Sequence, residues 1–180
     1  MKCIIKPEES IILNCFKSKN KEILFRAFTV FARPILDYCS NLWSPYRKSK
    51  IDLIESVQKR FTKRLHGLNE LQYSDRLKTL GTESPELRRL KSDLCLYYKI
   101  IVELIDLPVD EFFRFKQGVT RNNGACICIN SFRLNAERYY FKNRCVLTWN
   151  SLASNVVSAA SLILINAINA SMILNDIWMV

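Results

Sequence analysis

The sequence lacks the short motifs by which many enzymes are identified. It contains no GxSxG nucleophile elbow, no phosphate-binding P-loop and no HExxH zinc-protease motif. We therefore predict no catalytic residue, no small-molecule substrate and no cofactor. The acidic residues are interpreted as surface charges, helix-start residues or ion-pair partners: Glu55, Glu83, Glu103, Asp106, Asp110 and Glu111.

Histidine is nearly absent, which argues against a zinc site. A zinc knuckle needs a tight cluster of cysteine and histidine ligands, whereas the only histidine, His66, precedes Gly67 at an expected helix end, where it would face the helix dipole. Cys126 and Cys128 are closer in sequence than a CxxC pair and have no second pair nearby. No metal site is predicted. The seven cysteines, an odd number, favour free thiols in a reducing compartment: Cys3, Cys15, Cys39, Cys95, Cys126, Cys128 and Cys145.

A secretory signal is also lacking, because Lys6, Glu8 and Glu9 interrupt the apolar residues near the N-terminus. An intracellular location, the nucleus or the cytoplasm, is therefore expected. Residues 156–174 carry no charge and are long enough to span a bilayer. Several asparagine and serine residues interrupt them, however, and each would need a partner in lipid. A buried or aggregation-prone tail is favoured, with a membrane span as the alternative.

The composition is that of a globular protein with a positive surface. Hydrophobic residues make up 49% of the 180 residues, which is enough apolar material for the core of one domain or of two small lobes. The formal net charge is +10 and the isoelectric point is near 9.4. This charge favours an anionic partner, with nucleic acid as the first candidate and an ordinary solvated basic face as the alternative.

Apolar residues recur at helical spacing along most of the chain. Residues 22–32 are expected to form a helix that stops or kinks before Pro34, since proline disfavours the helical conformation of the residue before it. Residues 87–105 are expected to form a helix whose basic residues lie mainly in its first half. A last helix is expected at residues 134–152, with an apolar stripe of Phe141, Cys145, Trp149 and Leu152.

The helix expected between Ile51 and Leu65 separates its two faces most clearly. An apolar stripe can pack on a core, while basic side chains on the opposite side face outward. The stripe comprises Ile51, Ile54, Val57, Phe61 and Leu65, and the opposite side carries Ser56, Lys59, Arg60, Lys63 and Arg64.

Strand patterns are nearly missing, with Ala125 to Ile129 as the one short candidate. Glycine and asparagine residues between positions 115 and 130 indicate a loop that could act as a hinge. We therefore predict a mainly α fold, an irregular helical bundle that could consist of two small lobes joined by a loop near 115–130.

Several phrases of the sequence resemble one protein family. The stretch RPILDYCSNLWSPYRKSKIDLIESVQKRFTKRLHGL, Arg33 to Leu68, is similar to the region just downstream of the catalytic domain in non-LTR retrotransposon (jockey-like LINE) reverse transcriptases, where a phrase like RPILEYAS-W-P precedes VQRRFTK. The resemblance continues, in the order of the family, through YSDRLKTLG, PELRRLKSDLCLYYKI, Thr120-Arg121 and RYYFKNRCVLTWNSLASNVVSAASL, which ends at Leu162.

The resemblance, together with the loop composition at 115–130, implies a division of the chain. Residues 1–22 have no counterpart, residues 23–114 would form a helical thumb-like region, residues 115–130 a hinge, and residues 131–162 a C-terminal helical region. Residues 163–180 form a divergent apolar tail where the family usually has a basic helix, which is expected of a truncated or frame-shifted copy.

The resemblance also implies a role that does not involve catalysis. The family's polymerase carboxylates include an adjacent Asp-Asp pair, which would hold catalytic metal ions, and this chain has no Asp-Asp dipeptide. Its single histidine cannot supply the pattern of the family's endonuclease. The expected function is that of a non-catalytic C-terminal part of an RNA-directed DNA polymerase that grips RNA or an RNA–DNA hybrid without reading its sequence.

The candidate contacts to nucleic acid lie in and before the basic helix. Lys59, Arg60, Lys63 and Arg64 could neutralise phosphates. Trp43 and Tyr46, flanked by Arg47 and Lys48, could stack on bases, although an aromatic residue beside a proline turn more often covers the edge of a core. Two other classes remain as alternatives: an expressed relic of a decayed element without a present function, and a membrane-anchored basic protein that binds anionic lipid.

Overall fold

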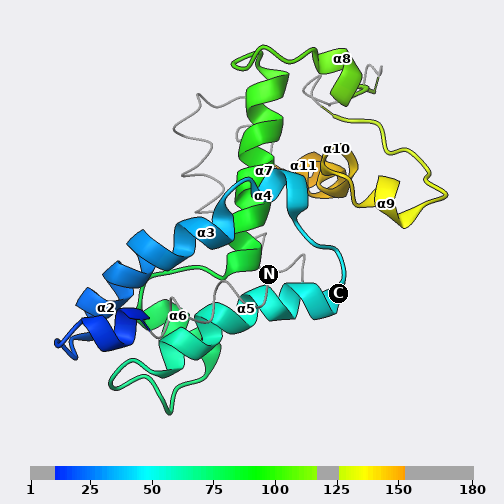
Figure 1. Cartoon of the computed structure of the whole chain (residues 1–180). Helices are drawn as coiled ribbons and strands as arrows, with labels where there is room; N and C mark the ends of the chain where they lie inside the picture. The colour runs from blue at the N-terminus through cyan, green and yellow to red at the C-terminus, as the bar shows by residue number, and fades with distance from the viewer. Residues whose placement is uncertain (1–10, 117–125, 153–180) are drawn as a thin grey trace. The chain divides into compact units, whose positions relative to one another are not determined.

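The computed structural model describes residues 11–116 and 126–152, and in this part the chain is mainly helical, with no β-strand (Figure 1). The prediction of a mainly α, irregular helical bundle is thus confirmed. The chain divides into two compact units, Met1–Arg89 and Leu90–Val180. The division falls inside helix α7 (Pro85–Ile101) and not at the loop near 115–130.

The first unit contains a helical run that passes through Pro34. Asn20 caps its start, since the Asn20 side chain accepts a hydrogen bond of 2.8 Å from the Glu22 N–H. The Arg33 N–H bonds the Phe28 carbonyl five residues back, so the hydrogen bonding becomes π-type just before the proline. Of the two expected outcomes, a stop or a kink before Pro34, the stop is wrong, because the wider π-type turn accommodates the backbone hydrogen bonds that the proline disturbs. The run comprises α2 (Lys21–Ala27), the π-helix η1 (Phe28–Ala32) and α3 (Arg33–Asp37).

The core of the first unit lies between this run and helix α5 (Lys48–Lys63). Four members of the predicted stripe, from Ile54 to Leu65, are buried, whereas Ile51 is half-buried. The ring of Phe61 stacks on that of Phe28 with 4.4 Å between centroids.

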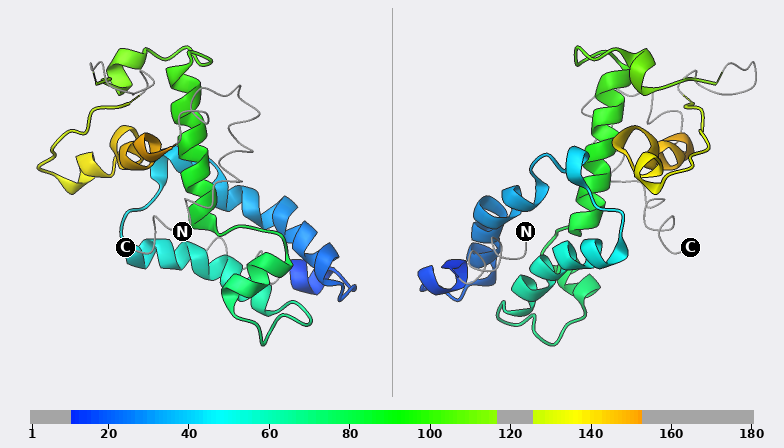
Figure 2. Two further views of the ribbon diagram at one scale, coloured as in Figure 1. Left: turned by 180° about the vertical axis from the view of Figure 1, so that it is seen from behind. Right: turned by 45° about the vertical axis from the view of Figure 1, so that its right-hand side comes forward.

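Helix α6 (Tyr73–Thr79) lies beside α5 (Figure 2). The short helix α4 (Ser40–Trp43) follows Cys39, whose φ of 49° is left-handed.

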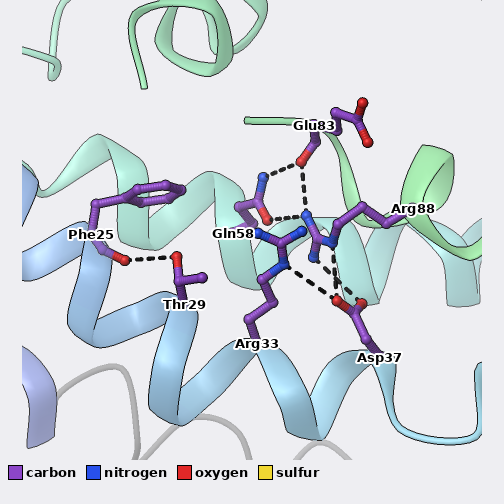
Figure 3. Close-up of polar contacts among 7 residues, drawn as sticks. All are labelled: Phe25, Thr29, Arg33, Asp37, Gln58, Glu83 and Arg88. Carbon is purple, nitrogen blue, oxygen red and sulfur yellow. Dashed lines mark hydrogen bonds and ion pairs between the residues drawn. The ribbon is translucent and has the colours of Figure 1, made fainter. Parts of the chain in front are cut away.

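A polar network around the buried side chains of Arg88 and Gln58 joins α3, α5 and the first turn of α7 (Figure 3). The Arg88 guanidinium donates to Asp37 from Nε (3.0 Å), to the Gln58 Oε1 atom (3.0 Å) and to the Glu83 carbonyl (2.8 Å). Gln58 donates to the same Glu83 carbonyl at 2.9 Å. In the first half of the helix expected at 87–105, the basic residues Arg88 and Arg89 are both buried.

Replacing Arg88 with methionine is expected to lower the free energy of unfolding by about 2–3 kcal/mol, because it removes charge-assisted hydrogen bonds and takes the donor from the buried Gln58 Oε1 atom. Urea denaturation would measure the change. Arg33→Met is the matched control, since Arg33 makes a longer contact of 3.4 Å to the same carboxylate with its side chain 30% exposed. It should cost less than about 1 kcal/mol. Equal losses for the two variants would contradict the importance of the Arg88 network.

In the second unit, aromatic rings surround Tyr97 of α7. The rings of Phe113, Phe141 and Trp149 lie 4.6, 5.2 and 5.9 Å from the Tyr97 ring between centroids. The Tyr97 hydroxyl donates to the Phe141 carbonyl at 3.0 Å. Four short helices complete the described part of this unit: α8 (Val109–Phe112), α9 (Asn135–Arg138), α10 (Phe141–Arg144) and α11 (Val146–Ser151).

Two predictions for the second unit differ from the structure. The helix predicted at residues 134–152 is divided into α9, α10 and α11, although Phe141, Cys145 and Trp149 of its stripe are buried. The strand predicted near Ile127 is reduced to a single antiparallel bridge between Phe115 and Ile127. Both ends of the loop near 115–130 therefore meet within one unit, and residues 117–125 between them lie outside the described part.

Candidate nucleic-acid interface

The four predicted phosphate contacts gather at the C-terminal end of α5. Lys59, Arg60, Lys63 and Arg64 are all exposed, whereas the apolar stripe on the other side of the helix is buried. Their backbone positions span about 7 Å along the axis, at a rise of about 1.5 Å per residue. A cationic group here also complements the negative end of the helix dipole. The arrangement can bind phosphates, and it also stabilises the helix.

The second predicted group lies at the other end of α5. Between Lys48 and Lys59 the helix advances about 16 Å, at about 1.5 Å per residue, so the structure does not bring the two groups into one cluster. Tyr46, Arg47 and Lys48 are exposed, and the Arg47 guanidinium carbon lies 5.9 Å from the centroid of the Tyr46 ring. A ligand that contacts both groups must follow α5 along its length.

Trp43 occupies a different position from Tyr46. It is half-buried and packs against the core cluster of the first unit. Its indole N–H donates to the Tyr38 carbonyl at 2.6 Å. The ring therefore covers the edge of the core, as the alternative interpretation expects, and the geometry favours Tyr46 over Trp43 as a surface on which a base could stack.

Two residues of α6 that the charge pattern did not single out contact Lys59. The Lys59 Nζ atom lies 5.2 Å from the centroid of the Tyr73 ring, and the Arg76 guanidinium carbon lies 5.4 Å from the same centroid. Arg76 also donates to the Lys59 carbonyl at 2.9 Å. Tyr73 belongs to the phrase YSDRLKTLG of the family resemblance, but no periodicity links it to Lys59. The signal for this contact lies only in the fold.

The Tyr73 hydroxyl is held by a buried carboxylate. It donates to Glu55 Oε1 at 2.6 Å, and Glu55 is 6% exposed. Burial, with a further contribution from the Glu55 carboxylate, raises the pKa of Tyr73 above its ordinary value. Tyr73 therefore remains protonated at neutral pH and acts as a donor.

The described residues offer little for metal or thiol chemistry. Among residues 11–116 and 126–152, no group of three or more histidine, cysteine or acidic side chains could hold a metal ion. Burial and the nearby Asp93 carboxylate raise the pKa of Cys145, so its thiol stays protonated. A cavity of about 240 Å³ in the second unit has walls of mixed charge, with Asp110, Glu111 and Lys142 among them.

No helix in the part that the structure describes is long and apolar enough to cross a membrane. The uncharged segment 156–174, the alternative membrane span, lies outside the described residues.

Comparisons with known proteins give a relative without an assigned activity and no matching family model. No protein-family model matches the chain, and no solved structure matches it. A protein of Caenorhabditis elegans named "Uncharacterized protein B0403.1" is 27% identical over 93 residues. The match covers 50% of this chain and 47% of that protein, so it spans about half the length of each. The relative's name assigns no activity.

Proposed function

We propose that this chain binds RNA or an RNA–DNA hybrid through phosphate contacts, without catalysis and without reading sequence. The observation that carries the proposal is the separation of charge on α5, whose C-terminal end carries four exposed cations while its apolar stripe is buried. Such a face can release counterions from a nucleic acid while the other side of the helix remains in the core. The resemblance to the thumb and connector of non-LTR retrotransposon reverse transcriptases supports this choice of ligand.

Fluorescence anisotropy with a labelled RNA–DNA hybrid across a salt series tests the proposal. If all four cations contact phosphate, the logarithm of the affinity should fall with the logarithm of salt concentration with a slope of about −3 to −4. Scattering must show that the protein is not aggregated. A folded, soluble chain that does not bind, or that binds without salt dependence, would overturn the proposal.

Removing two of the four cations should weaken this binding in a defined way. Replacing Lys63 and Arg64 with glutamine is expected to reduce the salt slope by about two and the affinity by about tenfold or more at physiological salt. The matched control replaces Lys17 and Lys19, exposed cations outside the proposed site, and lowers the net charge equally. If both double variants lose the same affinity, the binding reflects net charge and not the α5 face.

A second candidate is an expressed relic of a decayed element without a present function. The exposed apolar side chains along the α2–η1–α3 run favour it, because such surface usually needs a cover. They include Ile23, Val30, Phe31 and Ile35. Concentration-dependent scattering together with no salt-sensitive binding would support this candidate.

A further inference from the structure

The contacts of Lys59 distinguish it within the basic face of α5. We infer that Tyr73, supported by Arg76 and Glu55, is a positioning residue that holds Lys59 ready to contact a phosphate. This inference rests on the proposed function and names a residue of α6 that increases the affinity for nucleic acid.

Helix α6 holds both the main chain and the side chain of Lys59. Arg76 donates to the Lys59 carbonyl at 2.9 Å, which fixes the backbone near the end of α5. The ammonium group lies 5.2 Å from the centre of the Tyr73 ring, within the range of a cation–π interaction. The side chain thus starts from a restrained position.

Tyr73 itself contacts two residues of α5 that lie about one turn apart, Glu55 and Lys59. Glu55 precedes Lys59 by four residues, so the two side chains are neighbours on the helix surface. The hydroxyl of Tyr73 is bound to Glu55 at 2.6 Å while its ring faces Lys59. Since Glu55 is buried, this hydrogen bond anchors the ring from the side of the protein interior.

This arrangement prepares Lys59 for binding. A long surface side chain loses rotamer freedom when it contacts a ligand, and a side chain that is already restrained loses less. The ring attracts the ammonium group by its electrostatic face, which leaves N–H donors of the ammonium for phosphate oxygens. Loss of the ring should weaken binding only through Lys59.

A double-mutant cycle on hybrid affinity tests this coupling. Tyr73→Leu is expected to weaken binding by about two- to fivefold when Lys59 is present, in the range of an exposed cation–π interaction. In the Lys59→Gln background, Tyr73→Leu should have no further effect. An equal loss in both backgrounds would show a merely structural role, and no loss in either would show no role; both results overturn the inference.

Tyr73→Phe serves as the conservative control. It keeps the ring but removes the hydroxyl that donates to Glu55, so it should lower thermal stability and weaken hybrid binding less than Tyr73→Leu does. A loss of affinity as large as that of Tyr73→Leu would overturn a role of the ring.

A measurement on the wild-type protein covers the case in which Tyr73→Leu does not fold. The ε-methylene protons of Lys59 should resonate upfield of those of Lys63 in the NMR spectrum, because the adjacent Nζ atom lies over the Tyr73 ring. Equal shifts would overturn the inference. Wild-type protein that shows no salt-dependent binding but has the upfield shift would overturn the proposed function and leave Tyr73 a structural contact.

Discussion

Replacing Phe61 with alanine is expected to lower the free energy of unfolding by about 3–5 kcal/mol, as is typical of a large buried aromatic residue. Phe61 is fully buried in the core of the first unit. Its ring stacks on that of Phe28 at 4.4 Å and 20° between planes, so the substitution leaves a cavity and also removes an aromatic pair. The main source of the loss is the cavity, because neighbouring helices relax into it only in part.

Urea denaturation followed by circular dichroism would measure this loss. Lys63→Ala, two positions further along α5 on its exposed face, is the matched control and should change stability by less than about 0.5 kcal/mol. Phe61→Leu should fall between the two, because it retains much of the buried volume. A negligible effect of Phe61→Ala would mean that α5 presents a different face to the core.

In the second unit, Asp93→Ala is expected to cost about 3–5 kcal/mol, because it leaves the charge of Arg144 without its partner in a buried site. Arg144 donates to both carboxylate oxygens of Asp93, at 2.6 and 2.8 Å. The side chains are only 4% and 12% exposed for Asp93 and Arg144. The Cys145 thiol also lies 3.5 Å from the same carboxylate.

An exposed ion pair provides the control for Asp93→Ala. Lys48 and Asp52 on α5 are 3.8 Å apart and well exposed, so Asp52→Ala should cost no more than about 0.5 kcal/mol. The double variant Asp93→Leu with Arg144→Met removes both charges and should recover much of the loss. If the double variant is as unstable as Asp93→Ala, the cost arises from lost packing and not from the uncompensated charge.

The faces of α5 could be predicted because they depend on a local pattern. A helix between core and solvent repeats its apolar residues every three to four positions. The spacing of Ile54, Val57 and Phe61 therefore identifies the buried side without knowledge of what covers it. By the same rule the exposure of Lys59 and Lys63 follows from their positions between the apolar residues, although binding by these side chains remains a prediction.

Spacing alone could not predict where helices break. Phe141, Cys145 and Trp149 follow one another every four residues, as in a continuous helix, and all three are buried. Yet Cys145 has φ −105° and ψ 3°, which separates α10 from α11. Apolar periodicity reports which side chains face the core, and it does not report whether the backbone between them keeps its hydrogen bonds.

Long-range polar pairs had no local signal either. Arg88 and Asp37 are separated by 51 residues, and Tyr73 and Glu55 by 18. The sequence shows Arg88 only as one of several basic residues at the start of a helix. Its burial depends on the carboxylate of Asp37, which the fold places beside it from α3. A pattern within α7 cannot predict this contact.

Because of the π-helix η1, a change of one residue in the length of the first helical run would alter the structure that follows it. A wide turn holds one residue more than an α-helical turn of the same advance. A deletion within Phe28–Ala32 that restored the α-helical pattern would rotate everything after it by about 100°, the angle between successive residues of an α-helix. Leu36 would leave the core and Asp37 would turn away from Arg88. Related sequences should therefore conserve the number of residues in this segment more strictly than their identity.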